Sequence, residues 1–387
     1  MSKTTKSNRR SACCKSAASG IAAVRVGGTA AAILIFASLA QASNISVLGA
    51  ATGYNAFVFS TFSEYGTDSE GKIAVGGNFA PSSGGFTVAS KHSGDGAGVY
   101  DLVVGGNYTN TYVSVGGGDI LVGGNMNWNT PSLPNNAYVN GNVTNAGYGS
   151  VGGSIYYAGT YSSVGTLNAT KVKTPTTAPI DFLSAQTSLQ SLSSTLASQT
   201  ANGAVSMAYN TYTMTGTDKS LNVFNLTGSS FSGSTINITA PAGSTVVVNV
   251  AGSADSFNGG SINYTGVTQN NVIFNFNAAQ TLALASIAFN GTILAPYATV
   301  TGTWGQLNGQ IIANSLGGTM ELHDVLFAGT LPTGGGGTLA VSSQGPVAPE
   351  PSTWMLLAMA GLLWLVKMRR DAMPVVARVR ARVSGGK

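Results

Sequence analysis

The sequence predicts an all-β protein with one long helix: a β-solenoid, or β-helix, of coils about 18 residues long, an amphipathic helix packed alongside it, and a single C-terminal transmembrane helix. Three observations predict this class. A short phrase of an apolar residue and a Gly/Asn turn recurs, a longer match repeats at an offset of 18 residues, and only 8% of residues are charged while glycine contributes 52 of 387. Such a composition is typical of repetitive extracellular β proteins, whose tight turns need residues that tolerate positive φ.

The first element is a secretory signal peptide at residues 1–42. Six basic residues begin it, an apolar run from Thr29 to Ala40 follows, and the small residues Ala40 and Ala42 predict cleavage before Ser43. A retained anchor is the alternative, but 12 apolar residues span only about 18 Å, short of a hydrocarbon core of about 30 Å. Both cysteines lie within the leader, so the exported chain is expected to contain neither a disulfide nor a thiolate metal site.

The repeated phrase follows valines 75, 104, 122, 139 and 151, at intervals of 29, 18, 17 and 12 residues. Further along, residues 290–296 match residues 308–314 at an offset of 18. One solenoid coil of three short strands, stacked about 4.8 Å from the next, fits this length. The corners are expected at residues that accept left-handed conformations, namely Gly76, Gly77, Asn78, Gly105, Gly106, Asn107, Gly123, Gly124 and Asn125.

Strand-like alternation supports the same class. In residues 246–250 and 273–277, apolar side chains can turn inward while asparagines point outward or join a ladder between coils. An antiparallel sandwich also has short strands and glycine turns, and it stays open as the alternative.

One segment has helical periodicity instead. Apolar residues between 182 and 196 recur at helical spacings, Asp181 can cap the first turn, and Asn202-Gly203 can close the helix. The spacing predicts a helix over 180–198 that lies along the solenoid and covers its core. A helix that binds a partner is the alternative.

Residues 43–333 resemble the choice-of-anchor A adhesive domain, a relative of ice-binding-like β-solenoids. The resemblance rests on residues 57–59 and 71–78 near the start, and on residues 291–296, 308–313, 321–323 and 327–332 near the end. It implies adhesion or a structural role at the cell surface. A linker rich in Gly, Ser and Pro follows at 334–348.

The C-terminal element, 349–387, resembles a PEP-CTERM sorting signal. Pro349, Glu350 and Pro351 precede an apolar run with a transmembrane helix expected at 352–368, and Arg369 and Arg370 follow it. The resemblance implies recognition by an exosortase in a Gram-negative bacterium, with a transient stay in the inner membrane and a final place at the cell surface, the outer membrane or the extracellular matrix. The chain continues past the arginines to Lys387, which departs from the usual form; a plain membrane anchor is the alternative.

Charge and side-chain chemistry exclude several functions. Residues 43–346 hold five Lys, no Arg and eleven acidic residues, a net charge of −6, so a nucleic-acid partner is not expected. The two histidines, His92 and His323, lie far apart in the sequence. Alternation places Glu321 and His323 on one strand face and Asp324 on the other, so no metal-ligand set, cofactor or catalytic residue is predicted, and His323 is expected to cap the last coil.

The resulting prediction is an exported, non-enzymatic protein, adhesive or structural in an exopolysaccharide or biofilm matrix. Its expected partners are the secretion machinery and exosortase, then extracellular polysaccharide or neighbouring cells. A polysaccharide-degrading β-helix enzyme and an ice-binding protein are the alternatives; Thr299, Thr301 and Thr303 alternate on one face, but no similar rank recurs every 18 residues. The candidate contact residues are Tyr108, Tyr112, Trp128, Tyr138, Tyr148, Tyr156 and Tyr157.

Overall fold

In the computed structural model of the chain, the described residues run from Val47 to Pro332, without residues 83, 111, 130–131, 176–179 and 228–229 and without the side chain of Asn110. They lie in one compact unit that begins at Ile45. The predicted signal peptide (1–42), linker (334–348) and sorting tail (349–387), with its transmembrane helix at 352–368, lie outside them. Of the helices that the structure describes, none is long and apolar enough to cross a membrane.

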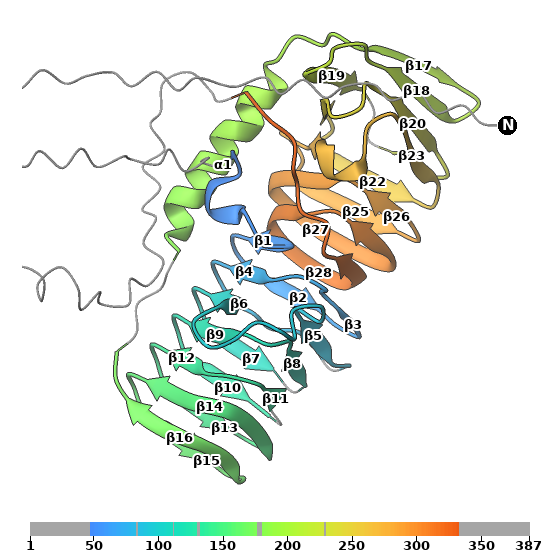
Figure 1. Ribbon diagram of the computed structural model, residues 1–387. Helices are drawn as coiled ribbons and strands as arrows, with labels where there is room; N and C mark the ends of the chain where they lie inside the picture. Colours follow the sequence, from blue (N-terminus) through green and yellow to red (C-terminus); the bar gives the residue numbers. More distant parts are fainter. Residues whose placement is uncertain are drawn as a thin grey trace, which may run out of the picture. The chain divides into compact units, whose positions relative to one another are not determined.

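The chain winds as a β-solenoid whose coils contribute strands to three faces in turn, named here A, B and C (Figure 1). Face A contains β1 (Ala56–Val58), β4 (Ile73–Val75), β6 (Tyr100–Val104), β9 (Asp119–Val122), β12 (Ala137–Val139), β19 (Leu221–Leu226), β21 (Thr245–Val250) and β24 (Val272–Asn275). Face B contains β2 (Phe62–Glu64), β7 (Tyr108–Asn110), β10 (Met126–Trp128), β13 (Val143–Asn145), β15 (Tyr161–Ser163), β22 (Ala254–Asn258) and β25 (Thr281–Ala285). Face C contains β3 (Thr67–Asp68), β5 (Phe86–Val88), β8 (Val113–Val115), β11 (Ser132–Leu133), β17 (Ala204–Ala208), β18 (Thr211–Thr215), β20 (Thr235–Thr239), β23 (Ser261–Thr265) and β26 (Ala288–Asn290).

Four longer strands turn from one face onto the next. These are β14 (Gly149–Tyr157) and β16 (Leu167–Lys173), which run from face C onto face A, and β27 (Thr292–Asn308) and β28 (Ile311–His323), which cross all three faces. Short 3-10 helices lie at Gly49–Ala51 and Gln269–Asn271.

Parallel pairing identifies the architecture. Strands of one coil pair in parallel with the equivalent strands of adjacent coils, as β4 does with β6 and β6 with β9. Among the described strands, only the β17–β18 hairpin pairs antiparallel. The solenoid predicted from the 18-residue repeat is therefore confirmed, and the antiparallel sandwich is excluded.

The order of the coils does not follow the sequence. The chain begins in the middle of the stack at β1, which pairs with β4 on one side and with β28 on the other. From β1 the coils continue to β16; helix α1 (Phe182–Ala197) then returns along face A, and a second set of coils runs from β17 to β28 (Figure 1). The first and last strands of the described chain thus meet as neighbours, with Ala56 opposite Ile311.

Two apolar clusters hold the fold together. One fills the solenoid interior, where Phe62, Phe79 and Tyr108 of successive coils stack with ring centroids 5.2 and 5.3 Å apart. The other lies between α1 and the outer side of face A. Each large apolar side chain buried in this way contributes about 1.5–3 kcal/mol.

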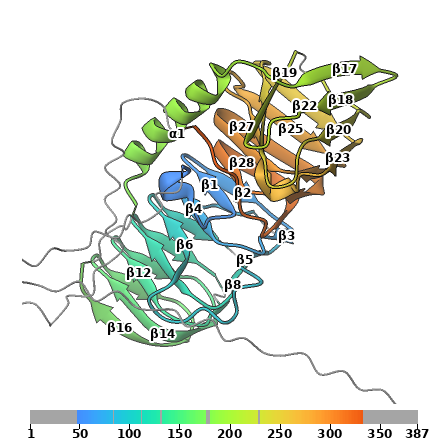
Figure 2. The same cartoon turned by 45° about the horizontal axis from the view of Figure 1, so that its top comes forward.

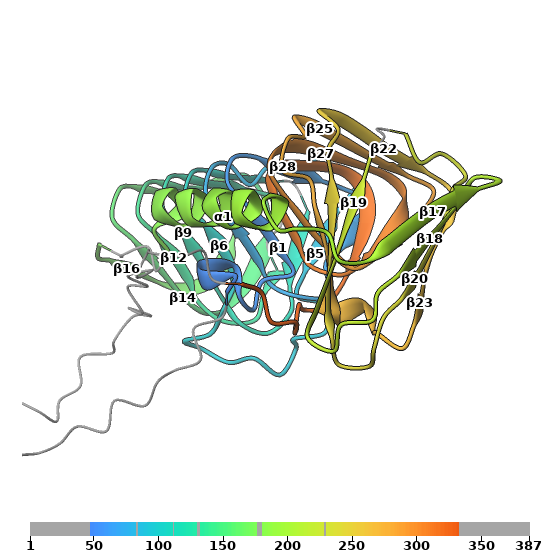
Figure 3. The same cartoon turned by 90° about the horizontal axis from the view of Figure 1, so that it is seen from above.

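Helix α1 lies along face A (Figures 2 and 3) and confirms the helix predicted from periodicity. The Asp181 carboxylate caps it by accepting a hydrogen bond from the Ser184 N–H at 3.1 Å. The predicted bounds and face need correction: the helix ends at Ala197, before Asn202-Gly203, and Leu183 is 75% exposed. A polar residue, Ser193, is buried instead, because its hydroxyl donates to the Asn275 side chain of face A at 2.6 Å.

Candidate functional site

The Gly-Gly-Asn phrases lie at the corner between faces A and B, where glycine is needed for a reason other than the expected left-handed backbone. None of these glycines has positive φ. Instead, a Cβ on Gly105 would lie 2.4 Å from the carbonyl oxygen of Gly76 in the adjacent coil, and one on Gly123 would lie 2.4 Å from that of Gly105. The close approach of stacked coils, not a left-handed backbone, therefore selects glycine at Gly76, Gly77, Gly105, Gly106, Gly123 and Gly124.

The asparagines of the phrase form a ladder. The side-chain oxygens of Asn78, Asn107 and Asn125 each accept the backbone N–H of the equivalent asparagine in the next coil, at 2.8–2.9 Å, and Asn142 accepts that of Thr160. These residues align the coils.

The last repeat phrase, at residues 151–154, belongs to another corner. Val151 pairs with Leu133 of face C, whereas Val139 pairs with Tyr157 on face A. The interval of 12 residues between Val139 and Val151 therefore compares two different corners. The coil length at this point is 18 residues, which is the separation of the paired residues Val139 and Tyr157.

Face B presents small, uncharged side chains in register. Thr299, Thr301 and Thr303 are exposed on β27, as their alternation predicts. On one side they pair with Thr281, Ala283 and Ala285; on the other, Thr299 and Thr301 pair with Ser315 and Gly317. This row of threonines therefore has neighbouring rows in register, in which Thr281 keeps threonine and the other positions hold alanine, serine or glycine.

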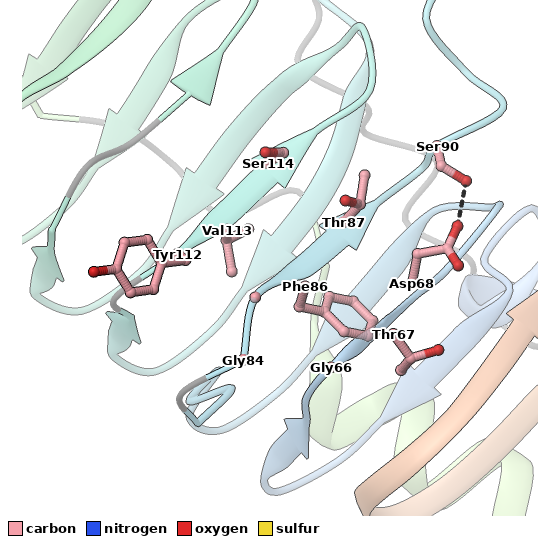
Figure 4. Close-up of a pocket in the computed structure, with 11 residues that line it drawn as sticks. Gly66, Thr67, Asp68, Gly84, Phe86, Thr87, Ser90, Tyr112, Val113 and Ser114 are labelled. Atoms are coloured by element: carbon pink, nitrogen blue, oxygen red, sulfur yellow. Dashed lines mark hydrogen bonds between the residues drawn. The ribbon is translucent and has the colours of Figure 1, made fainter. Parts of the chain in front are cut away.

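Two open recesses lie beside the corner between faces B and C. The larger, about 570 Å³, lies over β3, β5 and β8 (Figure 4), where the Ser90 hydroxyl donates to the Asp68 carboxylate at 2.6 Å. The smaller, about 450 Å³, lies on face B between the rank of Thr299 and Thr301 and the residues Ser63 and Tyr65. Hydroxyl groups line both recesses.

Both histidines lie at the seam where β28 joins the first coils. His92 lies 3.0 Å from the Asp324 carboxylate. His323, the residue before Asp324, hydrogen-bonds the Asn308 side chain and lies 3.2 Å from the Glu321 carboxylate. His323 thus lies at a junction between two sets of coils, not at a free end as expected.

Glu70 completes a group that sequence spacing did not predict. One ligand atom each from Glu70, Glu321 and His323 lies within 4.8 Å of the others, which is the donor set most suited to a metal among the described residues. Burial alone would raise the pKa of Glu70, but the Lys91 ammonium at 2.6 Å and the Asp324 N–H at 3.0 Å outweigh it and lower that pKa. The bond from the Asp324 N–H to Glu70 joins the two sets of coils, which gives the group a structural role.

The buried acids do not form an acid–base pair. Glu64 and Asp255 both point into the solenoid interior, where burial raises the pKa of Glu64 to about 8 and that of Asp255 to about 6. Neither residue lines either recess.

The seven aromatic residues that were predicted as ligand contacts lie in different environments. Tyr108 and Trp128 are core residues, and Tyr157 packs against that core. On face A, Tyr138 and Tyr156 stack on each other with ring centroids 4.8 Å apart. The remaining two, Tyr112 and Tyr148, are 56% and 71% exposed.

Sequence reasoning missed four exposed aromatic residues, Tyr65, Tyr209, Tyr297 and Trp304. Alternation from Thr299 would turn Trp304 inward, but its backbone has φ 52° and its side chain is 77% exposed. The remaining predicted site residues lie outside the described part of the chain: Ala40, Ala42, Ser43, Pro349, Glu350, Pro351, Arg369 and Arg370.

Comparison with known proteins gives one family. The family described as "Putative Ice-binding-like adhesive domain" matches residues 47–137 and 127–324. No curated protein matches the chain.

Two ice-binding proteins are among the similar solved structures. One, from the Antarctic ascomycete Antarctomyces psychrotrophicus, is 13% identical over 73% of this chain and 98% of its own, with a TM-score of 0.32. The other, from an Antarctic biological consortium, is 19% identical over 50% of this chain and 86% of its own, with a TM-score of 0.22. At these scores the likeness supports no argument about a ligand.

Proposed function

Because the chain belongs to the family of ice-binding-like adhesive domains, we propose that it is an exported, non-enzymatic adhesive protein of the cell surface or extracellular matrix. It acts by presenting the rigid face B and the adjoining B/C corner to a polymer or a neighbouring cell.

The observation that carries this proposal is the chemistry of face B. Its outward positions hold Ser, Thr, Asn, Ala and Gly, and the outward positions of the described face B strands include no charged residue. The charged side chains of the described residues gather elsewhere, chiefly at the seam around Asp324. A flat, hydroxyl-bearing, neutral surface suits partners that are bound by many weak hydrogen bonds, and it does not suit nucleic acid.

The two ends of the sequence support the proposed localisation. The signal peptide predicts export through the secretion machinery, and the tail from Pro349 predicts sorting by an exosortase in a Gram-negative bacterium that makes exopolysaccharide. The tail holds the chain in the inner membrane before processing. The final place is then the cell surface, the outer membrane or the biofilm matrix.

Two measurements test this proposed localisation. Mass analysis of the exported protein should find Ser43 at its N-terminus; a chain that keeps residues 1–42 would contradict the signal peptide. Deletion of residues 349–387 should release the protein into the medium, and continued membrane association would contradict the anchor.

Adhesion itself is tested in the host. An in-frame deletion strain should form less biofilm and fewer aggregates than its parent, and purified residues 43–346 should bind glycans or cells. Unchanged aggregation together with measurable polysaccharide cleavage by the purified protein would replace this proposal with the enzymatic alternative.

Ice binding is a second candidate, favoured by the in-register ranks of Thr281, Thr299 and Ser315 on face B. We expect it to show as thermal hysteresis that Thr301→Tyr abolishes, because the bulky ring disrupts the flat surface. Thr213→Tyr on face C, where Thr213 is also exposed, is the matched control. A protein without hysteresis would leave adhesion as the function.

A further inference from the structure

The corner between faces B and C, named here the B/C ridge, carries a regular series of aromatic side chains. Each coil passes through this corner just before its face C strand, and in the coils of β27, β3, β8 and β14 the corner residues are Trp304, Tyr65, Tyr112 and Tyr148. All four are exposed, by 77%, 40%, 56% and 71% respectively.

The pairing register places these aromatic residues on alternate coils. The Tyr65 N–H donates to Gly318 O at 2.9 Å, and the Trp304 N–H donates to the Thr319 hydroxyl at 3.3 Å, so the coil of Gly318 and Thr319 lies between them. On the other side of Tyr65 lies the coil of Gly85, whose carbonyl oxygen accepts a hydrogen bond from the Gly66 N–H.

The lower part of the ridge follows the same rule. The Phe86 N–H donates to Tyr112 O at 3.0 Å, which places Tyr112 in the coil directly below Gly85. Ser114 then pairs with Ser132, and Ser132 with Ser150, so one coil separates Tyr112 from Tyr148. Because stacked strands lie about 4.8 Å apart, the aromatic residues recur about every 10 Å along the ridge.

Glycines occupy the intervening corners next to Tyr65. Gly318 has φ 124° and Gly84 has φ 135°, conformations that residues with side chains rarely adopt. The two recesses open at these coils: Gly318 and Tyr65 line the smaller, and Gly84 and Tyr112 line the larger (Figure 4). Aromatic rings therefore alternate with hollows lined by the hydroxyls of Ser63, Thr301, Thr67, Thr87 and Ser114.

Trp304 adds an independent argument. A tryptophan at φ 52° is in a strained left-handed conformation; in the adjacent coil the equivalent corner residue is the smaller Ser286, with φ 51°. With 77% of its surface exposed, the ring gains little packing energy from this position. Strain that does not stabilise the fold is typical of a functional site.

We propose that the B/C ridge binds an extended, neutral, β-1,4-linked polysaccharide. In such a chain successive pyranose rings are turned over, so the same ring face recurs at every second sugar, a repeat that matches the aromatic spacing of about 10 Å along the ridge. The rings of Trp304, Tyr65, Tyr112 and Tyr148 stack on alternate sugars, and the hydroxyls of the recesses bind the sugar hydroxyls. This inference rests on the proposed adhesive function and names its ligand class.

The test is sedimentation of the purified protein with cellulose and with chitin, and with cross-linked dextran and starch as polymers that lack the extended repeat. Wild-type protein should bind one of the first two. Trp304→Ala and Tyr112→Ala should each weaken binding about two- to tenfold, and the double variant should weaken it further, since a stacked ring contributes about 0.5–1.5 kcal/mol. Tyr297→Ala, an exposed tyrosine at the corner between faces A and B, is the matched control and should bind as wild type.

A second variant separates binding from folding. Trp304→Gly should raise the melting temperature, because glycine relieves the strain at φ 52°, while it weakens binding as alanine does. A variant that lost both stability and binding would indicate a structural role and contradict the proposal. Equal binding to dextran, or equal loss in Tyr297→Ala, would also contradict it.

A cell-aggregation assay distinguishes a failure of the ridge proposal from a failure of the proposed adhesive function. If the deletion strain loses aggregation and the Trp304→Ala, Tyr112→Ala strain keeps it, the ridge proposal fails and the adhesive function stands. If the deletion strain aggregates as its parent does, the adhesive function fails.

Discussion

Replacing Glu64 with glutamine is expected to remove most of the loss of stability that this protein suffers as pH rises. Glu64 lies on β2 with its side chain inside the solenoid, fully buried. One carboxyl oxygen accepts the Met320 N–H at 3.0 Å, and the other has no hydrogen-bond partner. Glutamine keeps the shape and the bond to Met320 but cannot ionise.

The magnitude follows from the pKa. Burial raises the pKa of Glu64 from its ordinary 4.5 to about 8. Below pH 4.5 both the folded and the unfolded chain keep this proton. Between pH 4.5 and 8 only the folded chain keeps it, so the free energy of unfolding falls by about 1.4 kcal/mol per pH unit, on the order of 5 kcal/mol in all. The glutamine variant should be close to wild type at pH 4 and more stable by several kcal/mol at pH 9.

Urea unfolding followed by circular dichroism at pH 4 to 9 measures this difference. Asp255→Asn is the graded control: burial raises the pKa of Asp255 from 3.8 to only about 6, so its removal should reduce the slope between these two pH values and leave the fall above pH 6, which is due to Glu64, unchanged. Parallel pH profiles for wild type and Glu64→Gln would refute a buried, protonated Glu64.

Two further predictions concern the repeated corner. Gly105→Ala should destabilise the fold by about 1–3 kcal/mol, because its Cβ would lie 2.4 Å from Gly76 O, whereas Gly94→Ala, with open space around its Cβ, should have little effect; equal melting temperatures would contradict the close-approach argument. Asn125→Ala removes the acceptor for the Asn142 N–H and should cost about 1 kcal/mol in urea unfolding, and a neutral result would mean that the ladder does not stabilise the stack.

The sequence predicted those parts of the fold that local spacing encodes. The 18-residue offset gave the coil length, and the apolar periodicity with Asp181 gave the helix, because each depends on residues close in the sequence. The order of the coils was not predictable in this way. The pairing of β28 with β1 forms only after the chain has turned back along α1 and the edge of the second set of coils meets the edge of the first. The residue spacing within either strand does not encode this pairing.

The site was predictable only where alternation holds. Thr299, Thr301 and Thr303 are exposed as expected, but Trp304 breaks the alternation because its backbone is left-handed, and a lone tryptophan gives no sign of that. The charged group at the seam was missed for a related reason. Glu70 and His323 are distant in the sequence and meet only because the two sets of coils join there.

The measurement that tests the account most directly is amide hydrogen exchange of the protein with and without its bound polysaccharide. Slower exchange is expected at the B/C ridge and its recesses, in residues 61–68, 84–88, 112–115, 148–150, 299–305 and 315–318, with α1 unchanged. Protection confined to α1 or to the corner between faces A and B would contradict it.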